Sequence, residues 1–272
     1  MHRRVMIAAL AAAAACAGAA KAGELRVCAD PNNLPFSNQA GEGFENKIVE
    51  LIARDLGDAV QYTWWAQRRG YVRNTLNAGQ CDLVPGVASG VDMLAETRPY
   101  YRSTYVFVTR ADRRPAIASL DDPRLRKLTV GVQMVGDDAT NTPPAHALAR
   151  RGVTRNVRGF MLYGDYRQPN PPAAIIDAVA KGEVDVAVAW GPLAGYFAAR
   201  EPTPLTLTPV TPALDDGRWP MTFDIAMGVR KNDPAFRQEI DGELDKLRPQ
   251  IQAILAAYGV PLAPATPGRP SR

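Results

Sequence analysis

The sequence contains the same alternation of strand-like and helix-like segments twice, and this repetition restricts the fold more than any other feature. One copy runs from residue 25 to 88 and the other from 127 to 190. Each copy has three short apolar runs separated by two helical patterns, which is typical of a parallel sheet built from right-handed βαβ crossovers. The sequence therefore predicts two half-size α/β lobes.

The helical segments of the first copy have recognisable faces and ends. Ile48, Leu51, Ile52 and Leu56 share one face of a helix that ends at Gly57. A second helical pattern ends at Gly79. The first copy therefore predicts strands at 25–30, 59–65 and 81–88, with helices at 43–57 and 71–78.

The second copy follows the same order. Gly152 ends its first helix, and Pro192 suits the first turn of a further helix after the last strand. The predicted strands are 127–133, 157–164 and 184–190, and the predicted helices are 143–152 and 173–182.

Two alternating apolar stretches bracket the second copy, STYVFVTR at 103–110 and FDIAMGVR at 223–230. A chain that leaves one lobe by one strand and returns by another forms a hinge of two crossovers. The amphipathic stretch 233–258, with a second segment starting at Pro249, would pack back onto the first lobe. We therefore predict lobe 1 as 23–108 plus 224–261 and lobe 2 as 109–223, with a cleft between them.

The two ends of the chain differ from this pattern. Residues 1–22 carry Arg3 and Arg4, an apolar run and a small-residue site before Gly23, which predicts a cleaved signal peptide and an exported, periplasmic protein. No later apolar stretch is long enough to span a bilayer. The proline-rich segment 262–272 predicts a disordered tail.

Charge gives no reason to expect a nucleic-acid partner. The whole chain has 32 basic and 28 acidic residues, but the signal segment contains three of the basic ones. Its removal leaves 29 basic residues, so the mature net charge is near +1. A nucleic-acid-binding protein needs a strongly basic face.

Cysteine and histidine usage narrows the chemistry. Cys28 and Cys81 remain after processing, and in an oxidising compartment we expect them to form a disulfide. His146 is the one mature histidine, which makes a histidine-based triad or a multi-histidine metal site hard to build.

The carboxyl ends of both predicted sheets should face the cleft, where ligands bind in open α/β folds. Four segments qualify: 30–36, 85–92, 133–141 and 190–193. Their polar residues have two interpretations, as ligand contacts or as turn caps, and both stay open. These residues are Asn32, Asn33, Ser89 and Asn141.

Three aspartate pairs could bind a hard cation, since such ions take clustered carboxylates. Capping and turn formation explain the pairs better, and we expect no metal. Asp137 and Asp138 are the pair in a predicted cleft loop. The others are Asp121–Asp122 and Asp215–Asp216.

The order of elements, with LRVCADPNNLPFS near the mature start and PYY at 99–101, resembles the amino-acid-binding class of type II periplasmic solute-binding proteins. The resemblance implies that an arginine after the third strand clamps a substrate carboxylate and that an acid after the last strand of lobe 2 holds the ammonium. This chain has Met93 or its neighbours at the first position and Trp190 at the second. Without a bidentate arginine, a carboxylate loses its strongest orienting contact, so we expect an apolar cleft that does not recognise amino acids.

A narrower resemblance rests on five segments in one order, 28–37, 67–82, 97–108, 141–152 and 190–196. Together they resemble the J-type accessory proteins of quinoprotein methanol dehydrogenase systems. The resemblance implies a periplasmic binding-protein fold that helps to activate or mature a dehydrogenase dependent on pyrroloquinoline quinone (PQQ) and on calcium or a lanthanide. It also implies that the dehydrogenase, and its cytochrome c as a second candidate, are the partners, and that the protein has no cofactor of its own.

Aromatic and arginine side chains are good anchors for a protein partner. Core packing is the alternative for Trp65 and Tyr71, whereas we expect Trp190 to be exposed to the cleft. The predicted cleft residues are Asn32, Asn33, Phe36, Trp65, Arg68, Tyr71, Ser89, Asp137, Asp138 and Trp190.

Two other functions are compatible with the fold, because a fold does not fix a function. One is a transporter receptor for a small uncharged or aromatic solute. The other is an enzyme such as a dehydratase or hydrolase, for which Asp30, Asp92, Asp137 or Asp138 would have to supply the acid or base. None of these has a convincing partner in the sequence, and we expect no catalytic residue.

Overall fold

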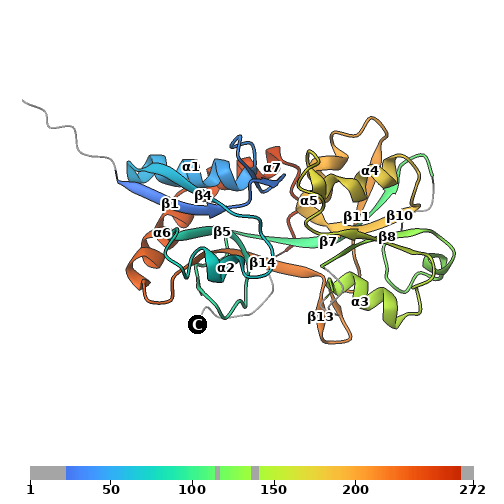
Figure 1. Cartoon of the computed structure of the whole chain (residues 1–272). Helices are drawn as coiled ribbons and strands as arrows, with labels where there is room; N and C mark the ends of the chain where they lie inside the picture. Colours follow the sequence, from blue (N-terminus) through green and yellow to red (C-terminus); the bar gives the residue numbers. More distant parts are fainter. Residues whose placement is uncertain (1–22, 114–116, 136–140, 265–272) are drawn as a thin grey trace, which may run out of the picture.

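A computed structural model describes residues 23–113, 117–135 and 141–264. The predicted signal peptide, the pair Asp137–Asp138 and residues 265–272 lie outside these ranges. The described chain forms two α/β lobes joined by two long strands (Figure 1). The predicted fold class, a two-lobed type II periplasmic binding fold, is confirmed.

The first lobe is built on a parallel sheet with β1 (Glu24–Ala29) at its centre. Six residues of β1 pair in register with β4 (Ala59–Trp64), and Val27 pairs with Leu83 at the start of β5 (Leu83–Ala88). Helix α1 (Phe44–Leu56) covers the sheet and ends at Gly57, whose φ of 77° favours glycine. All these elements lie where the sequence predicts them, within two residues.

The second predicted helix of this lobe is much shorter than expected. Helix α2 spans only Tyr71–Asn74 instead of 71–78. The backbone of Thr75 leaves helical geometry, and its hydroxyl donates a hydrogen bond to the carbonyl of Tyr71. Thr and Asn side chains compete with helical hydrogen bonds in this way, so the stretch up to Gly79 becomes a series of turns.

The second lobe repeats the arrangement. Strand β8 (Val130–Met134) lies between β10 (Val186–Trp190) and β9 (Val157–Met161), and both pairings are parallel. The sequence analysis predicted all three strands and both following helices, but it missed β11 (Leu205–Pro209), which pairs with β7. The helices of this lobe are α3 (Pro143–Arg150), α4 (Ala174–Ala180) and α5 (Gly191–Ala198).

The two hinge strands are β7 (Tyr101–Arg110) and β14 (Thr222–Val229). They pair antiparallel with each other over residues 101–104 and 222–225. Beyond this stretch β14 continues along β5, whereas β7 continues along β10. The sheets of the two lobes are therefore hydrogen-bonded into one through the middle of the molecule.

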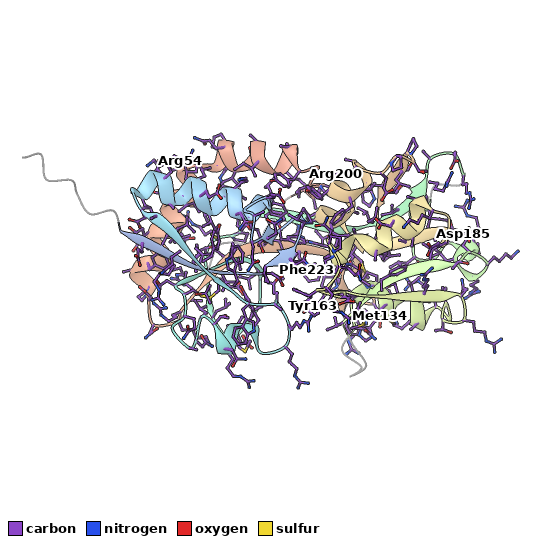
Figure 2. All side chains as sticks on the ribbon, turned by 45° about the horizontal axis from the view of Figure 1, so that its top comes forward. Arg54, Met134, Tyr163, Asp185, Arg200 and Phe223 are labelled. Carbon is purple, nitrogen blue, oxygen red and sulfur yellow. A yellow bond between two sulfur atoms is a disulfide. The ribbon has the colours of Figure 1, made fainter. Side chains whose placement is uncertain are left out.

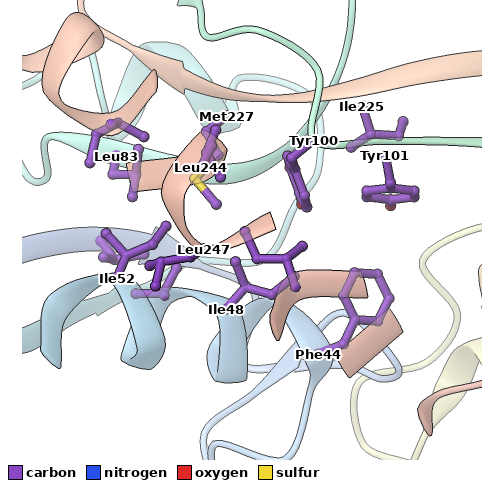
Figure 3. Packing of buried hydrophobic residues seen from close by; sticks show 14 of the residues in the cluster. Phe44, Ile48, Ile52, Leu83, Tyr100, Tyr101, Ile225, Met227, Leu244 and Leu247 are labelled. Carbon is purple, nitrogen blue, oxygen red and sulfur yellow. The ribbon is translucent and has the colours of Figure 1, made fainter. Parts of the chain in front are cut away.

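The core of the first lobe lies between its sheet and the helices that cover it. Ile48, Ile52, Leu83, Leu244 and Leu247 are all less than 5% exposed and pack together (Figure 3). The C-terminal helices α6 (Pro234–Lys246) and α7 (Arg248–Ala257) supply part of this cluster. The prediction that the stretch 233–258 packs on the first lobe, with a second segment near Pro249, is confirmed.

Cys28 and Cys81 form the predicted disulfide, with their Cα atoms 5.5 Å apart. Cys28 lies on β1, and Cys81 lies two residues before β5. After α7 the chain crosses to the hinge, where the backbone N–H of Ala263 donates to the carbonyl of Arg102. In the described parts of the chain, we find no helix with the length and apolar character needed to cross a bilayer.

Candidate functional site

A cavity of about 340 Å³ lies between the lobes, at the carboxyl ends of the parallel strands. Each of the four predicted cleft segments contributes to its wall, and so do the two hinge strands. The lining residues are Asn33, Phe36, Glu45, Gln67, Gly86, Ala88, Tyr101, Tyr105, Gln133, Leu162, Tyr163, Trp190, Leu193, Phe223 and Ile225.

Trp190 is placed in the cavity wall by the end of β10 and the start of α5. Its backbone N–H donates to the side-chain oxygen of Gln133 at 3.1 Å. A Cβ atom on the following Gly191 would lie 2.4 Å from the carbonyl oxygen of Thr104, so only glycine lets the helix begin this close to β7. The half-buried indole therefore has a fixed position at the centre of the molecule.

Six aromatic side chains line the cavity, and three of them, Tyr105, Trp190 and Phe223, form a contacting group. Trp190 meets Tyr105 edge to face with ring centroids 5.3 Å apart, and Phe223 at 5.8 Å. Figure 2 shows Phe223 and Tyr163 near the junction of the two lobes. Such edge-to-face contacts hold the rings rigidly, so the cavity has an apolar wall that is formed before any ligand arrives.

Glu45 lies in the wall on the side of the first lobe, in the first turn of α1. Its side chain is 7% exposed, and burial together with the negative charge of Asp30 raises its pKa to about 8. A Cβ atom at position 86 would lie 1.9 Å from one carboxyl oxygen, so Gly86 makes room for this acid. The sequence analysis missed Glu45 because an acid in the first turn of a helix is common on electrostatic grounds alone.

Asp30 connects the two lobes across one end of the cavity. It accepts hydrogen bonds from the backbone N–H groups of Asn32 at 2.9 Å and Gln67 at 2.6 Å, and from the hydroxyl of Tyr166. The guanidinium of Arg68 lies over the ring of Tyr166, 4.6 Å from its centroid. We call this group of contacts around Asp30, Asn32, Arg68 and Tyr166 the interlobe bridge.

The ten predicted cleft residues have different positions. Asn33, Phe36 and Trp190 line the cavity. Asn32 and Arg68 belong to the interlobe bridge, where the amide of Asn32 donates to the carbonyl of Gln168 at 3.0 Å. Three other predicted residues are described and do not line the cavity: Tyr71 is buried beside the disulfide, Trp65 is 45% exposed, and Ser89 is exposed. Asp137 and Asp138 lie outside the described residues.

The two described aspartate pairs hold the backbone and bind arginines. Asp122 caps a short 3-10 helix by accepting from the N–H of Arg124. Asp215 accepts from Arg150 and Arg151, each at 2.7 Å. Among residues 23–113, 117–135 and 141–264, no group of three or more His, Cys, Asp or Glu side chains could hold a metal ion.

The described lining of the cavity contains no arginine, lysine or histidine. Met93, at the expected arginine position, is 50% exposed and does not reach the cavity. The cavity therefore offers one acid and several rings, which suits an apolar or cationic group and gives no charged clamp for a carboxylate.

The two lobes, the hinge strands and the cavity between the lobes define the class of this protein. The profile of the family described as bacterial extracellular solute-binding proteins, family 3, matches residues 25–260. The chain belongs to this family.

Within the family, the relatives indicate a J-type protein. The chain is 38% identical to the protein MoxJ of Methylorubrum extorquens over 257 residues, which is 90% of this chain and 83% of that protein. It is 31% identical to MoxJ of Paracoccus denitrificans, over 89% of this chain and 90% of that protein. The crystal structure of the periplasmic binding protein XoxJ from Methylobacterium extorquens AM1 has a TM-score of 0.72 at 36% identity, covering 89% of this chain and 100% of that chain.

These similarities confirm the J-type resemblance that the sequence analysis predicts. The family is one of solute-binding proteins, and XoxJ is described as a periplasmic binding protein.

Proposed function

We propose that this protein is a periplasmic accessory protein that binds a PQQ-dependent methanol dehydrogenase and helps to activate or mature it. The dehydrogenase would hold its own calcium or lanthanide ion, and its cytochrome c is a second candidate partner. Export would depend on the predicted signal peptide of residues 1–22. The similarity to MoxJ and XoxJ over about nine tenths of the chain supports this proposal.

The aromatic cavity wall is the observation that carries the proposal. A receptor for free amino acids needs charged partners for both ends of its ligand, and the described lining has no basic residue. Trp190, Tyr105 and Phe223 instead present rigid aromatic surface, the kind of surface that anchors a segment of a protein partner or a small ligand linked to it.

The substitution Trp190→Ala tests this proposal in a reconstituted activation assay with the purified dehydrogenase. We expect the variant to fold but to activate the dehydrogenase at least about tenfold less at limiting concentration, since the loss of an aromatic anchor costs about 2 kcal/mol or more. Trp219→Ala is the matched control, because Trp219 stacks on His146 in the second lobe and does not line the cavity. Equal activation by the parent and by Trp190→Ala would contradict the role of the cavity.

A transporter receptor for a small uncharged or aromatic solute is the second candidate. The size of the cavity favours it, because 340 Å³ lies within the usual range of small-molecule sites. Titration with candidate solutes, followed by tryptophan emission, separates the two functions. Tight, saturable quenching by a metabolite, with no effect on the dehydrogenase, would favour the receptor.

A further inference from the structure

The cavity contains a buried acid without a partner. Glu45 is only 7% exposed as a residue, and its side chain lines the cavity. Its carboxyl oxygens are not among the fully buried polar atoms, so they face the cavity, and we find no hydrogen bond to them from the described residues. A buried polar group without a partner is costly, so such groups are normally paired with protein, water or ligand. A ligand atom beside Glu45 could therefore supply the hydrogen bond that the carboxyl group lacks.

Among the described residues, no positively charged group lowers the pKa of Glu45. The negative charge of Asp30 raises the pKa of Glu45, and the oxygens of Asp30 already accept the hydrogen bonds of the interlobe bridge. The other titratable groups that face Glu45 are tyrosines on β4, on α2, and at and just before the start of β7. Burial raises the pKa of each of them, so they stay neutral: Tyr62, Tyr71, Tyr100 and Tyr101.

The aromatic rings that line the cavity also favour a positively charged ligand. The faces of aromatic rings carry negative potential, which attracts cations when water is excluded. Tyr101 lies next to Phe44 in the close view of the core, with ring centroids 5.9 Å apart, and it also lines the cavity (Figure 3). A group that enters the cavity therefore meets one acid and several ring surfaces.

We propose that the cavity binds a small organic ammonium ion, with the Glu45 carboxylate as its counter-ion and the aromatic rings around its apolar body. The proposal takes the cavity of the proposed function as the binding site, but its test requires no dehydrogenase. The acid at the end of β10 that the resemblance implies for an ammonium is absent here, so Glu45 would supply the charge from the opposite lobe.

Binding of the ammonium should displace a proton. The raised pKa of Glu45 means that its carboxyl is mostly protonated near pH 7 in the empty cavity. The ammonium ion enters with its own charge intact, and Glu45 releases its proton to the solvent. We therefore expect close to one proton to be released per ligand bound, which calorimetry in buffers of different ionisation enthalpy measures directly.

The experiment compares benzylamine, which is protonated at pH 7, with the nearly isosteric benzyl alcohol. We expect the purified protein to bind the ammonium at least about tenfold more tightly, because a charge-assisted hydrogen bond to a carboxylate is stronger than a neutral one. In Glu45→Gln, the tighter binding of benzylamine over benzyl alcohol and the release of a proton should both disappear. Glu50→Gln is the matched control, because Glu50 lies on the same helix, pairs with Lys47 and is absent from the cavity lining.

Three results would overturn the proposal. They are equal or tighter binding of the alcohol, an ammonium preference that survives in Glu45→Gln, and no saturable binding of benzylamine at millimolar concentration. Tighter binding of the alcohol would mean that Glu45 acts as a neutral hydrogen-bond donor. The activation assay with Trp190→Ala remains a separate readout, so the proposed function can stand if this inference fails.

Discussion

At the scale of single residues, Glu45 and Trp190 give the cavity its character, one as a buried acid and the other as an apolar ring. Trp190 places an apolar ring where the resemblance to the amino-acid-binding class implies an acid, and Glu45 buries an acid in a cavity whose lining is mostly apolar. The position of each depends on one glycine. Gly191 lets α5 start against β7, and Gly86 leaves room for the Glu45 carboxyl.

The buried acid should make stability depend on pH in an unusual direction. The pKa of Glu45 is about 8 in the folded protein and near 4.5 when exposed, so between these values the folded state holds more protons than the unfolded state. The free energy of unfolding then falls as pH rises, by up to about 3 kcal/mol between about pH 5 and 7.5.

Urea denaturation of the parent and of Glu45→Gln at these two pH values measures the effect. Glutamine cannot ionise, so the variant should lose this part of the pH dependence, whereas Glu50→Gln should keep it. Identical pH profiles for the parent and Glu45→Gln would show that Glu45 titrates normally.

At the scale of elements, the disulfide ties the central strand of the first lobe to the turns that follow the short helix α2. Those turns are held by backbone hydrogen bonds within the segment, such as that from the N–H of Gln80 to the carbonyl of Thr75. Tyr71, Leu76 and Cys81 form a small cluster around the bridge. The disulfide thus fixes a segment that is no longer helical after Asn74.

The variant Cys28→Ser tests the contribution of the disulfide. Opening a loop of 53 residues should lower the free energy of unfolding by roughly 4 kcal/mol and the melting temperature by about 10 °C. Calorimetry measures both, and activation of the dehydrogenase below the melting temperature should stay unchanged. If Cys28→Ser melts where the parent does, the bridge contributes nothing to stability.

At the scale of the whole molecule, the lobes are joined in two ways. The hinge strands connect them covalently and through the continuous sheet, and the interlobe bridge connects them at one end of the cavity. The bridge consists of a few polar contacts between loops, so it can break without disturbing either core.

Tyr166→Phe removes the hydroxyl that donates to Asp30 but keeps the ring beneath Arg68. A hydrogen bond to a charged group contributes about 1.5–3 kcal/mol, so the loop after β9 should open about tenfold more often. Hydrogen exchange at the amide of Gln168, which is bonded to the carbonyl of Asp165, reports this opening. Tyr163→Phe is the control because no described partner bonds to its hydroxyl, and equal exchange in both variants would argue against the bridge.

The sequence alone predicted the repeated α/β units, the hinge strands, the C-terminal helices and the disulfide, because periodicity, glycine ends and cysteine pairing are local signals. It also identified Trp190, since the end of a parallel strand must face the cleft. Only the tertiary structure decided the roles of Glu45, Gln67, Tyr101, Tyr163 and Tyr166. Their burial and partners depend on segments distant in sequence, such as Gly86 against Glu45 and Asp30 against Tyr166, and no local pattern records which side chains two separate lobes bring together.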